Sequence, residues 1–125
     1  MRGRYLSTTD NVNNVYQLLG QQLTAFSVEP FKEQWCTNID KQNSDNISEL
    51  LYHNHSLYAG GQGIILRINP ENGIITNEAK EFGLSLNPEM LIMNDKLLML
   101  SKSRRNIDIY SLEDLALLDH IEQQF

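Results

Sequence analysis

The sequence predicts an all-β protein built from repeated antiparallel sheets, and three observations lead there. Short apolar or alternating runs, cut by turn residues, recur along the 125 residues, and this texture is typical of antiparallel strands. The same pattern of residues returns at an offset of 42 residues. An apolar share of 41% is enough to build one packed core in a chain of this length. We therefore expect a single domain over residues 1–125, with repeat units of about 8–49, 50–91 and 92–125.

The repeat is carried by positions that stay apolar in all three units. These positions are Val15, Leu57 and Met99, then Leu23, Ile65 and Ile107, then Phe26, Ile68 and Tyr110. Further upstream, Leu50 and Leu51 align with Ile92 and Met93. We predict that all of the first set except Val15 belong to the core, and that Tyr16 and Tyr58 pack between units.

The second unit shows the expected strands most clearly. Its predicted strands are Glu49–His53, Ser56–Gly60, Ile64–Ile68 and Ile74–Asn77. His53 to His55 form the first turn, and the segment from Gly60 to Gly63 forms a flexible second turn. Asn69-Pro70-Glu71-Asn72-Gly73 predicts a tight turn, because proline presets φ and Asn-Gly supplies the positive φ that a hairpin needs.

The third unit predicts the same four strands, with one alternative at its end. The expected strands are Met90–Met93, Lys96–Leu100, Ile107–Tyr110 and Ala116–Asp119. Ser111 followed by an acidic turn and Leu115 to Leu118 is also compatible with a capped helix. The repeat favours a turn there, since Ser111 to Asp114 align with the Asn69 to Asn72 turn.

Four short strands in about 42 residues are the size of a β-propeller blade, which buries its faces against neighbouring blades. The prediction is therefore a partial β-propeller of about three four-stranded antiparallel blades. We expect the first blade to be incomplete, because residues 1–7 hold no strand comparable to Glu49–His53. Closed propellers need about four to eight blades, so three would belong to a longer propeller, cap a partner or associate, for example as a six-bladed ring of two chains.

The stretch from Leu57 to Gly73 resembles the repeat of the pyrroloquinoline-quinone-like propellers: a strand, a glycine turn, a strand and an Asp-Pro-x-x-Gly turn. The first unit resembles it through Gln22 to Ser27, Lys32 and the late Trp35. Asn77 and Asp119 stand where Trp35 does, and Ser27, Asn69 and Ser111 replace the aspartate before the turn. These departures leave the subfamily open between quinoprotein-like and WD40-like propellers. The resemblance implies pyrroloquinoline quinone and Ca²⁺ at the axis of a complete ring, and no ligand set in this chain matches it.

Charge and composition exclude several classes of function. Ten Lys and Arg against 16 Asp and Glu give a net charge of −6, which removes the electrostatic attraction that nucleic-acid binding needs. The longest apolar runs, such as Ile64–Leu66 and Met90–Met93, fall far below the roughly 18–20 residues of a membrane span. No secretory signal is seen, and one cysteine forms no internal disulfide, so the location stays unknown with the cytoplasm favoured.

The residue types that usually carry chemistry have plainer interpretations here. His53, His55 and His120 lack a third ligand in the sequence pattern, and we expect them to be solvated. Cys36 is expected to be an inert packed thiol in a half-buried strand. The glycines from Gly60 to Gly63 precede no helix and no Lys-Ser pair, which excludes a phosphate loop. We assign no catalytic, cofactor-binding or metal-binding residue.

One basic cluster, formed by Lys102, Arg104 and Arg105, is the candidate docking site for an acidic protein partner. It falls in a turn between two predicted strands. The function favoured by the sequence is a non-catalytic propeller segment that serves as a protein-interaction or assembly scaffold. The alternative is a fragment of a quinoprotein-like dehydrogenase.

Overall fold

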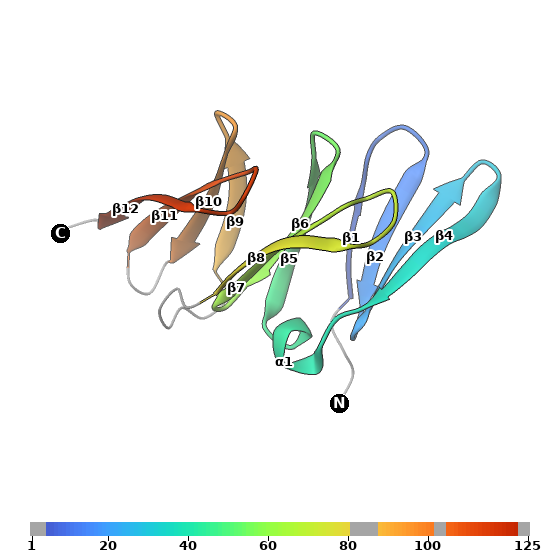
Figure 1. Cartoon of the computed structure of the whole chain (residues 1–125), viewed down its shortest axis with the longest axis horizontal. Coiled ribbons are helices and arrows are strands. Elements are labelled where there is room, and N and C mark those ends of the chain that lie inside the picture. The colour runs from blue at the N-terminus through green and yellow to red at the C-terminus, as the bar shows by residue number, and fades with distance from the viewer. Residues whose placement is uncertain (1–4, 81–87, 102–104, 123–125) are drawn as a thin grey trace.

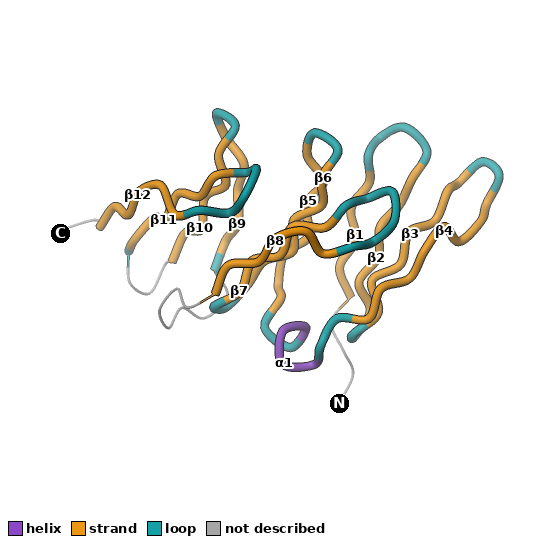
Figure 2. Tube along the Cα trace, in the orientation of Figure 1, coloured by secondary structure: helices purple, strands orange, loops and turns teal. Residues whose placement is uncertain are grey.

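A computed structural model of the chain describes residues 5–80, 88–101 and 105–122. Strands make up nearly all of this part of the chain (Figure 2). They form three four-stranded antiparallel sheets, in which each strand pairs with the next one along the sequence. The sheets stand side by side (Figure 1). The fold is therefore all-β, with three blades of the predicted kind.

Each blade is one run of four strands. Blade 1 contains β1 (Tyr5–Thr9), β2 (Asn14–Leu19), β3 (Gln22–Val28) and β4 (Phe31–Asn38). Blade 2 contains β5 (Ile47–His53), β6 (Ser56–Gly61), β7 (Ile64–Ile68) and β8 (Ile75–Lys80). Blade 3 contains β9 (Glu89–Met93), β10 (Lys96–Ser101), β11 (Asn106–Ser111) and β12 (Leu117–Glu122).

Blade 1 has its first strand, so the expectation of an incomplete first blade is wrong. β1 pairs with β2 over five residues, from Tyr5 opposite Leu19 to Thr9 opposite Val15. Its sequence, Tyr-Leu-Ser-Thr-Thr, is less apolar than Glu49–His53, and that difference hid it. β-branched and aromatic residues suit a strand even where the apolar content is low.

A four-residue helix, α1 (Lys41–Ser44), joins blades 1 and 2 and was not predicted. Asp40 caps it by accepting a hydrogen bond from the backbone N–H of Gln42 at 3.3 Å. Among the described residues this is the one helix, and it is far too short to cross a membrane.

Two-residue hairpin turns open blades 2 and 3. Asn54 and His55 have φ of 51° and 62°, and Asn94 and Asp95 have φ of 52° and 57°. Positive φ at both positions matches the twist of the flanking strands, and asparagine tolerates that conformation best among residues with a side chain.

Gly60 and Gly61 lie inside β6 and are buried, which corrects the prediction that they belong to a turn. A Cβ on Gly60 would lie 2.7 Å from the Met90 sulfur of blade 3. A Cβ on Gly61 would overlap the backbone of Asn46. The glycines serve close packing on both sides of blade 2, and only Gln62 and Gly63 form the turn.

The turn after β11 repeats the turn after β7, so the alternative helix is wrong. Gly73 N–H donates to the Asn69 carbonyl at 2.8 Å, and Leu115 N–H donates to the Ser111 carbonyl at 2.9 Å. Tertiary register outweighs the local helix signal from Ser111 onward.

The offset of 42 holds for the second half of blade 3 but not for the first. Ile68 pairs with Leu57, whereas its counterpart Tyr110 pairs with Leu97 and not with Met99. The connection from β10 to β11 has four residues, two more than the connection from β6 to β7, and this extra length shifts the first hairpin. Ile92 therefore takes the place of Tyr52, opposite Leu97.

Apolar side chains fill both gaps between blades. One buried cluster joins blades 1 and 2 and includes Leu18, Leu23, Leu57, Leu66 and Ile68. A second cluster joins blades 2 and 3 and includes Tyr58, Ile65, Met90, Leu97, Met99 and Tyr110.

Two of the predicted core residues are only half-buried, namely Phe26 and Ile107. Each lies on the outward side of an end blade. The repeat positions are thus fully buried only where another blade covers them.

Candidate functional site

Side-chain hydrogen bonds lock blade 2 against blade 1. The Trp35 indole N–H donates to the Pro70 carbonyl at 2.8 Å, and the Thr37 hydroxyl donates to the Gly73 carbonyl at 2.7 Å. Gly73 has φ of 77°, and a Cβ there would overlap the Trp35 ring. The late tryptophan of the first unit therefore fixes the β7–β8 turn of the next blade.

The junction between blades 2 and 3 uses different residues at the same repeat positions. Asn77 replaces Trp35, and Leu115 replaces Gly73 with a buried side chain at φ of 61°. Here the Tyr58 hydroxyl donates to the Leu112 carbonyl at 2.9 Å. Arg67 donates to the Glu113 carbonyl at 2.6 Å. The two blade junctions are thus held by different side chains at the same repeat positions.

Tyr16 and Tyr58 both lie between blades, as predicted. The Tyr16 ring stacks on Tyr52 of blade 2, with centroids 5.7 Å apart and planes 5° apart. Tyr16 is 3% exposed. Its hydroxyl has no hydrogen-bond partner among the described residues. Tyr58 donates to the Leu112 carbonyl, and the carbonyl at the same repeat position for Tyr16 is that of Pro70. Trp35 already donates to the Pro70 carbonyl.

The histidines of blade 2 do not form a metal site. His55 is exposed, and its Nδ1 lies 3.4 Å from the Tyr52 hydroxyl, while His53 is half-buried at the end of β5. Within residues 5–80, 88–101 and 105–122, no three His, Cys, Asp or Glu side chains are placed to share a metal ion.

His120 has carboxylate partners that its sequence neighbourhood did not reveal. Its Nδ1 contacts Asp108 across the β11–β12 pair, and its Nε2 lies 3.3 Å from Glu122. The hydrogen bond to Asp108, followed by the one to Glu122, raises the pKa of His120 above its ordinary value of 6.5. The i, i+2 spacing of His120 and Glu122 on a strand was the available signal.

The predicted basic docking site is described only at Arg105. Lys102 and Arg104 lie outside the described residues. Arg105 is exposed next to β11, with φ of 57°. The docking role of these three residues stays a prediction.

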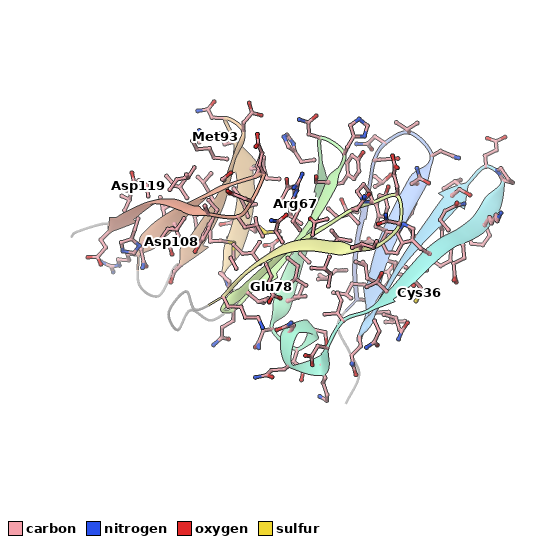
Figure 3. All side chains as sticks on the ribbon, in the orientation of Figure 1. Cys36, Arg67, Glu78, Met93, Asp108 and Asp119 are labelled. Carbon is pink, nitrogen blue, oxygen red and sulfur yellow. The ribbon has the colours of Figure 1, made fainter. Side chains whose placement is uncertain are left out.

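Cys36 is exposed, so the prediction of a packed thiol is wrong. β4 is the last strand of blade 1, and Trp35 occupies its inward side. Cys36 therefore points to the opposite side, away from blade 2 (Figure 3). Its thiol lies 2.8 Å from the Gln22 side-chain oxygen and 3.4 Å from the Thr24 hydroxyl.

These contacts belong to the free face of blade 1, the side turned away from blade 2. Gln22 also donates to the Asn38 side chain at 3.0 Å. Phe26 and Phe31 stack at the turn end of the same face, with centroids 5.5 Å apart. The face is mixed: one group of polar side chains bonds internally, while the apolar side chains of Tyr5, Leu19, Val28 and Phe31 on it are 55–76% exposed.

The far face of blade 3, the side turned away from blade 2, carries a group of apolar side chains with Glu89, Lys96 and Asp119 beside them. Alternation along the strands places its residues opposite the buried Met90, Leu97, Met99 and Tyr110. The apolar side chains of the far face of blade 3 are those of Leu91, Met93, Leu98, Leu100, Ile107, Ile109 and Ile121. Leu91, Met93 and Ile121 are 43%, 60% and 43% exposed. Among the described residues, no sheet lies against this face.

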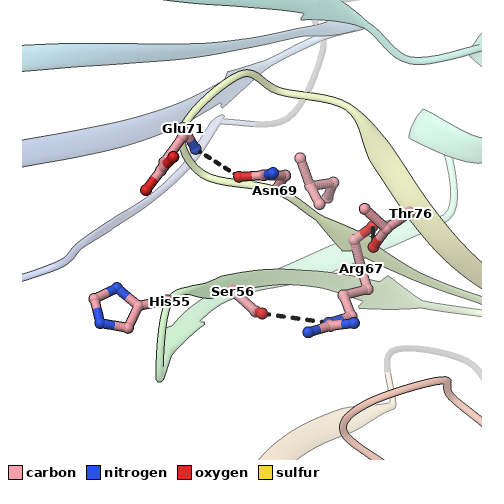
Figure 4. A pocket seen from close by; sticks show the side chains of 7 residues that line it. His55, Ser56, Arg67, Asn69, Glu71 and Thr76 are labelled. Atoms are coloured by element: carbon pink, nitrogen blue, oxygen red, sulfur yellow. Dashed lines mark hydrogen bonds between the residues drawn. The ribbon is translucent and has the colours of Figure 1, made fainter.

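A polar cleft of about 430 Å³ lies between blades 1 and 2, at the end where the β1–β2 loop and the β7–β8 turn meet. It is lined by Asp10, Val12, Asn14, Tyr16, Ala25, Gln34, Tyr52, His55, Pro70 and Glu71. A smaller hollow of about 260 Å³ adjoins it at His55 and Glu71 and extends to Arg67 (Figure 4). We call the larger hollow the blade 1–2 cleft.

Negative charge in the blade 1–2 cleft is fixed by its loops. Burial alone would raise the pKa of Asp10, but the Asn14 side chain and the N–H groups of Val12, Asn13 and Asn14 lower it to about 2. Burial is the main cause that raises the pKa of Tyr16 to about 12, followed by charge interactions with Asp10, Tyr52 and Glu71.

No local sequence motif marks the blade 1–2 cleft or the far face of blade 3. The cleft residues run from position 10 to position 71 and come from four strands and three connections. The one available signal was the repeat itself, since Tyr16 and Tyr58 share a position while Trp35 and Asn77 do not.

Comparisons with known proteins bear on the fold. No family model and no curated protein sequence matches the chain. BamB from Moraxella catarrhalis superposes with a TM-score of 0.67 over 90% of this chain and 35% of that chain, at 11% identity. A computationally designed protein, Ika8, gives 0.72 over 93% and 35%, at 9% identity.

The WD40 domain of SCAP from fission yeast gives a TM-score of 0.61 over 98% of this chain and 35% of that chain, at 10% identity. Propellers of both quinoprotein-like and WD40 type are thus among the structural neighbours. The chain spans about a third of the length of each of these three. The β-propeller fold predicted from the repeat is confirmed, whereas the quinoprotein repeat itself stays a resemblance.

Proposed function

We propose that the chain is a non-catalytic β-propeller segment that acts as a protein-interaction scaffold, and that the far face of blade 3 is its main binding surface. The observation that carries this proposal is the uncovered apolar row on that face. Contiguous exposed apolar surface on a folded protein is a common mark of protein contact.

Repeat positions support the proposal, because they show what normally covers such a face. Leu23 and Ile65 are 0% exposed, since blades 2 and 3 pack over them. Their counterpart Ile107 is half-buried on the far face. Covering the remaining exposed apolar area contributes roughly 25 cal/mol per Å², so contact with another surface there is favourable.

The free face of blade 1 holds a group of bonded polar side chains beside its apolar ones. On the free face of blade 1, Gln22, Thr24 and Cys36 bond one another. We infer that partners add at blade 3, where Leu98, Leu100 and Ile109 offer apolar contacts on neighbouring strands.

The purified chain tests this proposal by its own association, because the apolar face can then be covered only by a second copy. We expect its mass by light scattering to rise with concentration, as mass action requires. Replacing Leu91 and Met93 together with lysine should leave the blades folded and keep the chain monomeric, since both side chains are already exposed.

Ile74→Lys is the matched control, because Ile74 is 59% exposed on the β7–β8 turn and lies off the far face. It should associate like the unaltered chain. The proposal is overturned if the unaltered chain stays monomeric at every concentration, or if the lysine variant of Leu91 and Met93 associates equally well.

A further inference from the structure

We propose that the blade 1–2 cleft binds the side chain of an arginine from a protein partner. This inference rests on the proposed interaction function, because its ligand is a protein segment. It adds a second site, on another blade junction and of opposite chemistry to the far face of blade 3.

The first support is charge. The cleft lining carries the carboxylates of Asp10 and Glu71 and no Lys or Arg side chain. Asp10 already accepts three backbone N–H groups at one oxygen and one amide at the other, so its place is fixed. Glu71 has no ion pair among the described residues, which leaves its carboxylate available to a cation.

The second support is the hydroxyl of Tyr16, a residue that is 3% exposed and lines the cleft, and whose hydroxyl has no partner in the described structure. The equivalent hydroxyl of Tyr58 donates to Leu112. At the first junction the equivalent carbonyl is bonded by Trp35 instead. The Tyr16 oxygen can therefore accept a hydrogen bond from a ligand donor.

The third support is shape. Tyr52, which is half-buried and stacks on Tyr16, presents aromatic surface in the cleft lining. A guanidinium group is planar, stacks on aromatic rings and pairs with a carboxylate through two parallel hydrogen bonds. At about 430 Å³ the cleft is larger than one side chain needs, so it can also take the flanking peptide. Val12, 87% exposed at the rim, offers an apolar contact for those flanking residues.

The arginine of the neighbouring hollow is already bonded elsewhere, so a cation in the blade 1–2 cleft must come from another molecule. Arg67, which lines that hollow, donates to the Ser56 hydroxyl at 3.2 Å (Figure 4) and to the Glu113 carbonyl at 2.6 Å. Arg67 therefore stabilises the junction between blades 2 and 3 and does not neutralise the carboxylates of the blade 1–2 cleft.

The test uses the peptide acetyl-Gly-Arg-Gly-amide and the same peptide with citrulline, which keeps the shape of arginine without its charge. Binding is followed by NMR shifts of the cleft amides at low protein concentration. We expect the arginine peptide to bind at least about tenfold more tightly than the citrulline peptide, because charge-assisted hydrogen bonds are the strong ones. Its affinity should fall as salt is added.

Two variants locate the site. Glu71→Gln should weaken arginine binding by roughly tenfold, through loss of the charged pair. Glu113→Gln is the matched control, since Glu113 holds the same turn position in blade 3 and lies outside the cleft lining; it should change nothing. Tyr16→Phe should weaken binding several-fold without lowering stability, because the hydroxyl bonds no described residue.

Equal affinity for the arginine and citrulline peptides would overturn the inference, as would equal affinity for a lysine peptide or unchanged binding in Glu71→Gln. The same titration on the Leu91 and Met93 lysine variant separates the two proposals. If that variant binds arginine and the unaltered chain does not self-associate, only the proposal for the far face of blade 3 is refuted. If the unaltered chain self-associates and no arginine binds, only the proposal for the blade 1–2 cleft is refuted.

Discussion

Replacing Gly73 with alanine will destabilise the chain, because the methyl group enters the junction between blades 1 and 2. The new Cβ would lie 2.8 Å from Cδ2 of Trp35 and would also overlap the Thr37 hydroxyl. The ring and the hydroxyl both hold carbonyls of the same turn, at Pro70 and Gly73. Neither can move without losing its hydrogen bond.

The magnitude follows from two contributions. A residue with a Cβ in the left-handed region costs roughly 1–2 kcal/mol, and Gly73 has φ of 77°. Two lost hydrogen bonds add about 1 kcal/mol each. Gly73→Ala should therefore lower the free energy of unfolding by about 3–4 kcal/mol.

Gly63→Ala is the matched control, since Gly63 has φ of 73° and open space where the methyl would stand. It should lose only the backbone contribution, about 1–2 kcal/mol. Both substitutions reduce the entropy of the unfolded chain alike, so that effect cancels in the comparison. Urea unfolding of the two variants, followed by circular dichroism at low concentration, gives the difference. If the two variants lose the same stability, the contact between Trp35 and Gly73 does not hold the blades together.

Two further outcomes can be measured on the same instrument. Tyr58→Phe should lower the free energy of unfolding by about 1 kcal/mol through loss of the bond to Leu112, whereas Tyr16→Phe should leave it unchanged; a reversed order would contradict the account of the two junctions. Because carboxylates raise the pKa of His120 in the folded state, its contribution to stability is full below its ordinary pKa of 6.5 and is lost as the pH rises through the raised value. The urea midpoint should fall over that range, and His120→Gln should reduce the fall; an unchanged pH profile in the variant would refute the role of this histidine.

Much of the fold could be predicted because the repeat reports burial directly. Leu23 and Ile65 align in the sequence and are both fully buried at equivalent junctions. Each blade needs an apolar side chain at the position where the neighbouring blade packs. Apolar residues therefore recur at a fixed spacing in the sequence. Ile107 carries that signal although no described blade packs over it.

What could not be predicted depends on contacts between units. The two extra residues between β10 and β11 move Leu97 into the place expected for Met99, and only the strand pairing reveals the shift. The exposure of Cys36 depends on which side of β4 meets blade 2. The Tyr16 hydroxyl in the blade 1–2 cleft lacks a partner because Trp35, and not Tyr16, bonds the carbonyl of Pro70. Either residue type could make that bond, so the sequence does not show which one does.

Hydrogen exchange measured at low and at high protein concentration tests the central claim most directly, because it maps where the chain makes contact. The account predicts that backbone protection rises with concentration in blade 3, over β9 to β12, while blade 1 stays unchanged. Protection that rises over β1 to β4 instead, or that does not depend on concentration in any blade, would contradict the assignment of the far face of blade 3 as the binding surface.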